Sequence, residues 1–397
     1  SIMALPSRTI EELRAPAERM RAVAEIAARH SADVDREGRF PREAIDALKA
    51  ERLMAVMIPK RFGGEGLGLL EVAELCTILG QACGSTAMVY AMHQIKASSL
   101  VSHGGESPWH AGFMREMVAE QYLLASATTE GGIGGDLRNS LCAVEVKDGR
   151  FTLEKDATVI SYGLYADAIL VTCRRAPDAQ SSDQSMVVVK QGDYSLAKTT
   201  GWDTLGMRGT CSEGFRLVSS GDAAQIFPQP FSEIAAQSML SASHILWGAV
   251  WFGIAADAVA RAQAYVRAAA RKQPGSVPPG ALRLAEVVAM LQDMKASVVA
   301  GVVRYEAALK SPDELSSIGF AVEMNNLKVT TSQRGAQIVT HAMLITGLSG
   351  YKNDTPFSVG RHLRDITSAA IMISNDRILS NTSNLLLVSR FDTSLVN

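Results

Sequence analysis

The chain has 397 residues, of which 47% are hydrophobic, and it carries a formal net charge of −2. This length and apolar content allow two or three domains with a sizeable core. The small net charge argues against a general affinity for nucleic acid or anionic membrane surfaces, because either needs a concentrated basic surface. We therefore expect small molecules as partners and no nucleic acid.

The cysteines and the apolar residues bear on the compartment of the protein. The five cysteines are scattered, without a CxxC or Cys/His ligand spacing, which argues against a disulfide framework or a zinc site. No uninterrupted run of about 18 apolar residues occurs, and the first residues become charged too early for a signal peptide. We expect a cytoplasmic protein with no membrane span.

Helical periodicity dominates the chain up to about residue 118. Over residues 10–30, apolar side chains recur at intervals of three and four, as in an amphipathic helix. Further helices are expected over 41–51, 69–80 and 85–100, and Pro108 can open one more.

The period changes after Gln121. Over 121–220, short segments rich in β-branched residues alternate with turn signals, which predicts about seven strands. The segments are YLLASAT, CAVEVK, FTLEKD, ATVIS, AILVTC, SMVVVK and FRLVSS. Because no helix-length segment separates them, they favour a small barrel or sandwich over a βαβ sheet.

After Pro228 the helical period returns and continues to the end of the chain. Long antiparallel helices joined by short loops form a bundle. The four long helical patterns lie near 231–270, 280–309, 312–345 and 355–388.

A glycine-rich stretch, TTEGGIGGD, lies between two strand-like segments, from Thr128 to Asp136. Its glycines let the backbone approach a flat or anionic ligand closely, and its backbone N–H groups and two threonine hydroxyls can donate hydrogen bonds to one. Such a loop more often only joins strands, so by itself it is weak evidence for a cofactor site.

Four strings occur in order along the chain: MIPKRFGGEGLGLLEVAELCTILGQACGSTAMVYAMH, ATTEGGIGGD, LGMRGTCSEGF and TGLSGYKNDTPFSVGRHLRD. Together they resemble motifs of the acyl-CoA dehydrogenase superfamily of FAD enzymes, and the resemblance covers nearly the whole chain. It implies an α+β, mainly α fold with a helical N-terminal domain (1–119), a central small β-barrel (120–228) and a C-terminal four-helix bundle (229–397).

The resemblance also implies which residues hold FAD. The glycine-rich loop would face the flavin ring and leave room for the pyrophosphate, and Ser161 would bring a hydroxyl near flavin N5. In this family an Arg of one subunit reaches the FAD pyrophosphate of its neighbour. Gly347 matches a glycine of the family's motif, and Asn375 lies where the family has a Thr near the cofactor. The implied cofactor residues are Thr128, Thr129, Gly134, Gly135, Ser161, Arg271 (with Arg267 as a competing register), Gly347 and Asn375.

The family's arginines and aspartate near the C-terminus are present as Arg361, Arg364 and Asp365. For these three residues we favour a structural ion-pair network over direct catalysis.

The catalytic carboxylate of the family is missing. Its common position falls on Ile373, and its second known position falls close to Ser243. Dehydrogenation of an acyl thioester needs a base at the α-carbon. His244 is adjacent to the second position and has a suitable pKa range, although it can equally be an ordinary buried histidine between helices. His93 lies on the helix that faces the flavin, and Glu130 lies in the glycine-rich loop.

Three functions remain open. The first is an FAD-dependent dehydrogenase that oxidises an acyl thioester, such as an acyl-CoA, with a non-standard base and a separate electron acceptor. The second is a flavin-dependent monooxygenase or oxidase of the same fold, which uses dioxygen and needs no α-proton base. The third is a catalytically silent flavoprotein or partner subunit. The resemblance further implies a homotetramer or homodimer.

Overall fold

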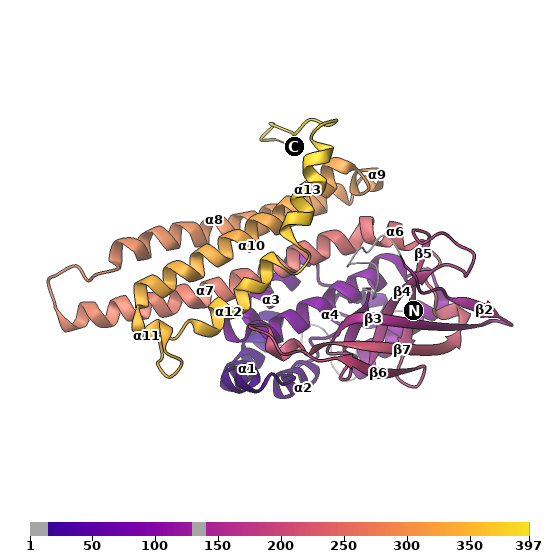
Figure 1. Cartoon of the computed structure of the whole chain (residues 1–397), viewed down its shortest axis with the longest axis horizontal. Helices are drawn as coiled ribbons and strands as arrows, with labels where there is room; N and C mark the ends of the chain where they lie inside the picture. Colours follow the sequence, from indigo (N-terminus) through magenta and orange to yellow (C-terminus); the bar gives the residue numbers. More distant parts are fainter. Residues whose placement is uncertain (1–14, 129–139, 397) are drawn as a thin grey trace.

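The computed structural model describes residues 15–128 and 140–396 of the chain. Its N-terminal part is helical (Figure 1). Pro16 opens the first helix, and Gly38 ends it with a φ of 61°, a left-handed conformation that glycine adopts without strain. The long helices of this part are α1 (Pro16–Glu37), α2 (Arg42–Ala50), α3 (Leu69–Ala82), α4 (Gly84–His103) and α5 (Pro108–Glu120).

The described strands of the middle segment form two sheets. Their orders are β1-β4-β5 and β2-β3-β7-β6, and β1 and β4 pair in parallel while the other pairs are antiparallel. The strands are β1 (Leu124–Ala127), β2 (Glu145–Lys147), β3 (Arg150–Ser161), β4 (Ala168–Arg174), β5 (Gln184–Lys190), β6 (Tyr194–Thr200) and β7 (Ser212–Asp222).

Two strand predictions were wrong. The segments FTLEKD and ATVIS are one long strand, β3, whose side chains alternate between buried and exposed along most of its length. Strand β6 was missed because most of its residues are exposed and it lacks the apolar run that signals a strand.

The C-terminal part is a helical bundle. Its long helices are α7 (Leu240–Lys272), α8 (Ala281–Ala308) and α10 (Ile318–Thr346), and a π-helical turn, η5 (Ala235–Met239), joins α7 to α6 (Phe231–Ile234). The shorter elements are α9 (Pro312–Leu315), α11 (Leu348–Tyr351), α12 (Gly360–Thr367), η6 (Ser368–Ala370) and α13 (Asn375–Leu385).

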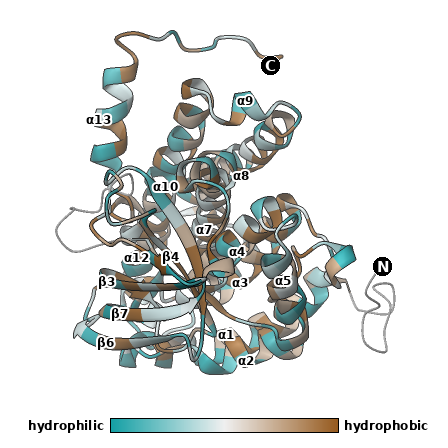
Figure 2. Cartoon of the chain, turned by 90° about the vertical axis from the view of Figure 1, so that its right-hand side faces the viewer, coloured by the Kyte–Doolittle hydropathy of each residue, from teal (hydrophilic) through white to brown (hydrophobic). Residues whose placement is uncertain are grey.

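The fourth long helix predicted over 355–388 is wrong as a continuous element. The chain leaves α12, makes one 3₁₀ turn and starts α13 only at Asn375. Ile373, between these helices, has a φ of 55°, which a β-branched residue rarely adopts. The break turns α13 away from the bundle, and Figures 1 and 2 show this helix standing clear of the body.

The continuous segment Phe231–Lys272 is long and apolar enough to cross a membrane by composition. However, 83% of its most apolar window is buried inside the protein. It packs against α3, α4, α8 and α10, so it is the central helix of the core. No segment of this kind was expected from the sequence, because isolated polar residues interrupt the apolar run of Phe231–Lys272.

Charged residues join the three parts of the chain. Asp365 of α12 accepts a hydrogen bond from the backbone N–H of Met207 at 2.8 Å, and Arg364 forms a bidentate ion pair with Asp35 of α1, one of whose bonds is 2.8 Å. Gly206 lies so close to α12 that a Cβ would be 2.1 Å from the Arg364 carbonyl oxygen. These contacts support the structural role expected for Arg364 and Asp365.

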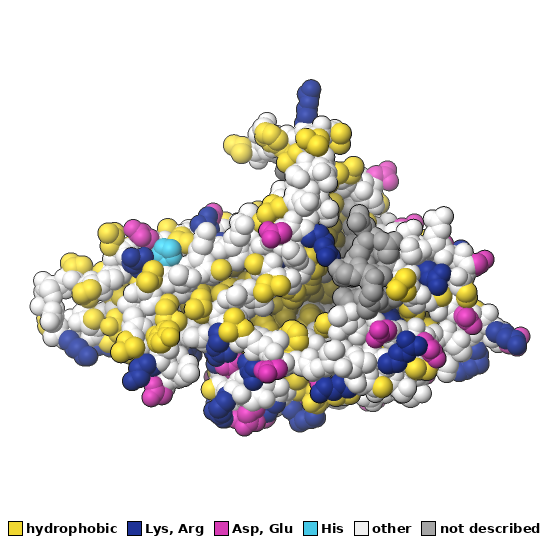
Figure 3. Space-filling model, viewed as in Figure 1, with side chains coloured by type: hydrophobic (Ala, Val, Ile, Leu, Met, Phe, Trp, Pro, Cys, Tyr) yellow, Lys and Arg dark blue, Asp and Glu magenta, His cyan; other side chains and the backbone are white. Residues whose placement is uncertain are grey.

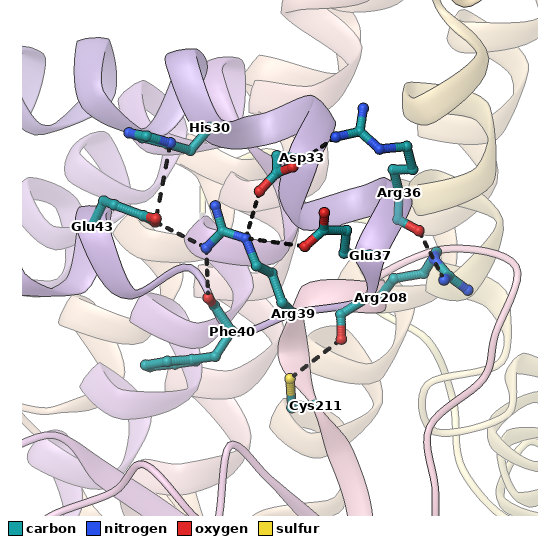
Figure 4. Close-up of polar contacts among 10 residues, drawn as sticks. His30, Asp33, Arg36, Glu37, Arg39, Phe40, Glu43, Arg208 and Cys211 are labelled. Carbon is teal, nitrogen blue, oxygen red and sulfur yellow. Dashed lines mark hydrogen bonds and ion pairs between the residues drawn. The ribbon is translucent and has the colours of Figure 1, made fainter.

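The same junction continues on the surface of α1 (Figure 4). Arg39 lies between two carboxylates, with Nε 2.6 Å from Asp33 and Nη1 3.0 Å from Glu43. Arg208, from the segment before β7, donates to the Asp35 carbonyl at 2.6 Å. The β strands are thereby held against the N-terminal helices.

Candidate functional site

Three hydroxyl groups form a row where β3 meets β7. Ser161 closes β3, Ser212 opens β7, and the two residues are paired in the sheet. Their Oγ atoms are 2.7 Å apart, and Ser212 Oγ is also 2.7 Å from Oγ1 of Thr210. A register shift between Ala157 and Ile160 precedes Ser161, and a bulge of this kind redirects the following side chain.

The described part of the glycine-rich loop is its first residue, Thr128. Thr128 follows β1 and accepts a hydrogen bond from Ser126 Oγ at 3.4 Å. The predicted residues Thr129, Gly134 and Gly135, together with Glu130, lie outside the described residues.

His93 on α4 is fully buried and bonded at both ring nitrogens. Nε2 donates to the Met54 carbonyl at 2.7 Å, and Nδ1 accepts from the Leu124 N–H at 2.9 Å. Burial lowers the pKa of His93 to about 4, so the neutral ring that these two bonds require is the stable form. His93 therefore joins α4 to β1, and a catalytic role would need one of these bonds to break.

His244 on α7 is also buried, but only one of its ring nitrogens is bonded. Nε2 donates to Asn325 Oδ1 of α10 at 3.0 Å, while Nδ1 has no partner among the described residues. Burial lowers the pKa of His244 to about 4. The Asn325 bond fixes the tautomer in which Nδ1 carries a lone pair, so His244 presents an unused proton acceptor.

Two tryptophans extend this face of α7. Trp247 and Trp251 follow His244 at intervals of three and four, so the three side chains share one side of the helix. Trp247 meets the His244 ring edge-on at 5.6 Å, and the Nε1 donors of both tryptophans are buried without a partner among the described residues. Figure 3 shows a hollow with a hydrophobic lining between the bundle and the strands.

Lys328 of α10 lies behind this face. Its side chain is fully buried, and Nζ donates to the carbonyls of Ala369 at 2.8 Å and Ile373 at 2.6 Å and to Asn375 Oδ1 at 2.7 Å. Nζ also lies 5.8 Å from the centre of the Trp251 ring. Lys328 thus holds the turn between α12 and α13.

Asn375 belongs to this cluster and not to the hydroxyl row. Besides accepting from Lys328, its Nδ2 donates to Ser332 Oγ at 2.9 Å. The Asn375 amide, predicted to lie near the cofactor, is therefore bonded to α10 through both its oxygen and its nitrogen. Asn375 is also the first residue of α13.

Arg271 is in the last turn of α7 and Gly347 directly follows α10, and these two helices end on the side of the molecule away from the strands (Figure 1). Arg271 is exposed in the last turn of α7, and Gly347 is exposed after α10, with a φ of 58°. Because α7 has 33 residues, it is about 50 Å long at ~1.5 Å per residue. One chain does not bring these two residues to Ser161.

Sequence reasoning missed Asn325 and Lys328. Lys328 carried a signal, because it falls in the buried stripe of α10 between Met324 and Thr331, where a lysine is rare unless it has partners. Asn325 carried none, since its role depends on the packing of α10 against α7.

Known protein families match two long segments of the chain. Residues 10–121 match the family model "Acyl-CoA dehydrogenase, N-terminal domain" and residues 234–381 match "Acyl-CoA dehydrogenase, C-terminal domain". The chain is 27% identical over 364 residues to the cyclohex-1-ene-1-carbonyl-CoA dehydrogenase of Geobacter metallireducens, covering 90% of this chain and 92% of that one.

Solved structures confirm the fold. Butyryl-CoA dehydrogenase from Megasphaera elsdenii superposes with a TM-score of 0.76 at 22% identity, covering 94% of this chain and 99% of that one. FMN-bound TdsC, a dibenzothiophene monooxygenase from a Paenibacillus strain, gives a TM-score of 0.81 at 19% identity, covering 95% of this chain and 98% of that one. The predicted α+β, mainly α fold class is confirmed. The chain belongs to the acyl-CoA dehydrogenase superfamily of flavin-dependent oxidoreductases.

Proposed function

We propose that this protein is an FAD-dependent dehydrogenase of an acyl thioester, such as an acyl-CoA, in which His244 accepts the α-proton. The observation that carries the proposal is the unpartnered Nδ1 of a buried, neutral imidazole beside the position where the family's second carboxylate would lie. The site residues proposed below rest on this geometry and on the family motifs.

The residues present fit a flavin. The hydroxyls of Ser161 and Ser212 and the Thr128 end of the glycine-rich loop offer the hydrogen bonds that its polar edge needs. The Nε1 donors of Trp247 and Trp251 are buried and have no partner among the described residues, so this side of α7 keeps hydrogen-bond donors that a ligand could use. When bound, the flavin supplies the hydride acceptor for the substrate β-carbon.

His244 removes the proton from the α-carbon. Asn325 holds the Nε2–H so that Nδ1 faces the substrate with a lone pair. A pKa of about 4 makes this a weak base in the empty site. Negative charge that develops on the adjacent substrate raises the imidazole pKa and favours the transfer.

Anaerobic mixing with saturated acyl-CoA thioesters of different chain lengths tests the proposal. We expect the purified protein to be yellow, with its flavin absorbance bleached by at least one thioester and the matching 2-enoyl-CoA formed. A colourless protein that FAD does not reconstitute contradicts any flavin-dependent reaction. A yellow protein that no thioester bleaches contradicts the dehydrogenase reading.

The lack of a carboxylate at the family's two base positions favours a second candidate function, a flavin-dependent monooxygenase or oxidase. Ile373 and Ser243 stand where the family places its carboxylate, and a monooxygenase or oxidase that uses dioxygen needs no such group. For that candidate, the reduced enzyme should consume oxygen and oxidise a substrate other than a thioester. A silent flavoprotein or partner subunit would show neither reaction.

We also propose that the protein is a homotetramer or homodimer in which Arg271 and Gly347 of one copy complete the FAD site of another. Their distance from Ser161 within one chain supports this arrangement. Exposed apolar side chains of the C-terminal half offer the contact surface; among them are Leu282, Val303, Leu387, Val388 and Phe391.

Replacing Arg271 with Ala is expected to weaken FAD binding about 10- to 100-fold, because a charge-assisted bond to phosphate is lost. Flavin fluorescence released on dilution measures this loss, and light scattering gives the mass of the assembly. Arg267→Ala is the matched control and should leave the flavin bound. A monomer that retains its full flavin content contradicts the proposal.

A further inference from the structure

Another buried lysine, Lys96 of α4, has no oxygen partner among the residues that the structure describes. Its side chain is 5% exposed, and Nζ contacts only a thioether among the described residues, Met239 Sδ at 3.2 Å. Sulfur of this kind is a weak acceptor. Lys328 is equally buried but donates to three oxygens, so burial alone does not explain the environment of Lys96.

A second cation lies near Lys96. Within the described chain the one charged group that acts on it is Lys155 of β3, a cation whose Nζ donates to the carbonyl and hydroxyl of Thr172 at 2.6 and 3.1 Å. Burial, and then Lys155, lower the pKa of Lys96 to about 8. His103, further along α4, is bonded to Ser238. An uncompensated cation in such a place is costly.

An unused hydroxyl lies next to this cation. Ser99 follows Lys96 by one turn on the same side of α4, is fully buried, and has an Oγ with no partner among the described residues. An ammonium and a hydroxyl that both lack acceptors are complementary to an oxygen-rich anion such as a carboxylate.

The position of Lys96 on α4, against η5, sets its distance from the proposed base. Met239, the last residue of η5, contacts Lys96 and precedes the proposed base His244 by five residues, which is ~7.5 Å along the helix axis at ~1.5 Å per residue. The backbone there is the π-helical turn η5, a form that is frequent at functional sites. A short carbon chain spans this distance.

We propose that Lys96, assisted by Ser99, binds a carboxylate at the far end of the substrate, so that the substrate class is an acyl thioester with a distal carboxyl group. That the substrate is an acyl thioester rests on the proposed function, whereas the anion site at Lys96 does not. The carboxylate accepts hydrogen bonds from Nζ and from the Ser99 hydroxyl and neutralises the buried charge.

Isothermal titration of the flavin-loaded protein, kept anaerobic, tests this site, and the free dicarboxylates bind there without any reaction of the flavin. The probes are glutarate and adipate, their mono-CoA thioesters, and the uncharged pentanoyl- and hexanoyl-CoA of matched length. We expect wild type to bind the carboxyl-bearing thioesters about 10- to 100-fold more tightly than the matched ones, as a charge-assisted bond implies. In Lys96→Met this preference should vanish, while the exposed-lysine control Lys295→Met should keep it.

The stability of the ligand-free protein gives an independent readout. Removing an uncompensated buried charge should leave the melting temperature of Lys96→Met equal to or above that of wild type. A clear fall would assign Lys96 a structural partner and overturn the proposal, as would wild-type binding that ignores the distal carboxylate. If free glutarate and adipate bind through Lys96 but no thioester reduces the flavin, the anion site stands and the proposed function fails.

Discussion

Replacing His244 with Ala is expected to slow the reduction of the flavin by an acyl-CoA roughly a thousandfold, within the range that general base catalysis contributes. The flavin should stay bound and the fold intact, because the His244 ring makes a single hydrogen bond, to Asn325. Stopped-flow absorbance in the absence of oxygen measures the rate constant. An unchanged rate constant would remove His244 from the mechanism.

Two variants separate proton removal from other effects. Asn325→Ala leaves the imidazole but releases its Nε2–H, so we expect a smaller, roughly tenfold loss from imprecise orientation. Adding Ser243→Glu to His244→Ala places a carboxylate at the family's second position, and it should restore part of the rate. If the added carboxylate restores nothing, the lost step was not proton abstraction at this site.

The pH dependence follows from the same residue. Because burial lowers the pKa of His244 to about 4, the neutral, proton-accepting form prevails above that value. The rate constant should therefore stay flat from pH 8 to about pH 5 and fall as the pH approaches 4. If the rate constant of wild type falls below pH 7 and that of His244→Ala does not, the surroundings of the His244 ring differ from those described above.

Replacing Lys328 with Met is expected to destabilise the protein by about 3 kcal/mol. The change removes the cost of burying an ammonium, but it leaves the Ala369 and Ile373 carbonyls and Asn375 Oδ1 without their donor. Three unpaired buried acceptors outweigh the gain. Denaturant unfolding measures the difference in the free energy of unfolding.

A matched lysine provides the control for this prediction. Lys295 on α8 is exposed, so Lys295→Met should change the free energy of unfolding by less than ~0.5 kcal/mol. The contrast with Lys96→Met is sharper. Lys96 has no oxygen acceptor within the described part of the chain, so its replacement should not destabilise the protein. Equal destabilisation by both buried substitutions would contradict the contacts assigned to Lys328.

The order of the three parts could be predicted from the sequence because each has its own period. Apolar residues at intervals of three and four mark α7, and alternation marks β3. The break before α13 could not be predicted, since it depends on Lys328 reaching from α10 to carbonyls about 40 residues away. Strand β6 was missed because pairing with β7, and not an apolar run, makes it a strand.

The candidate site was predictable only in part. Ser161 was predicted as a site residue from its place in a motif, but its partner Ser212 depends on the register of β3 with β7. His93 was predicted as a catalytic residue, and the structure adds that both of its ring nitrogens are bonded to backbone. The charge state of a buried histidine depends on such contacts, which no local pattern reveals.

Exchange of the substrate α-proton with deuterated water tests most directly whether an imidazole replaces the missing carboxylate. Wild-type protein incubated anaerobically with a saturated acyl-CoA should place deuterium on the α-carbon of the recovered thioester, and His244→Ala should place almost none. Equal deuterium incorporation by both proteins would contradict the account.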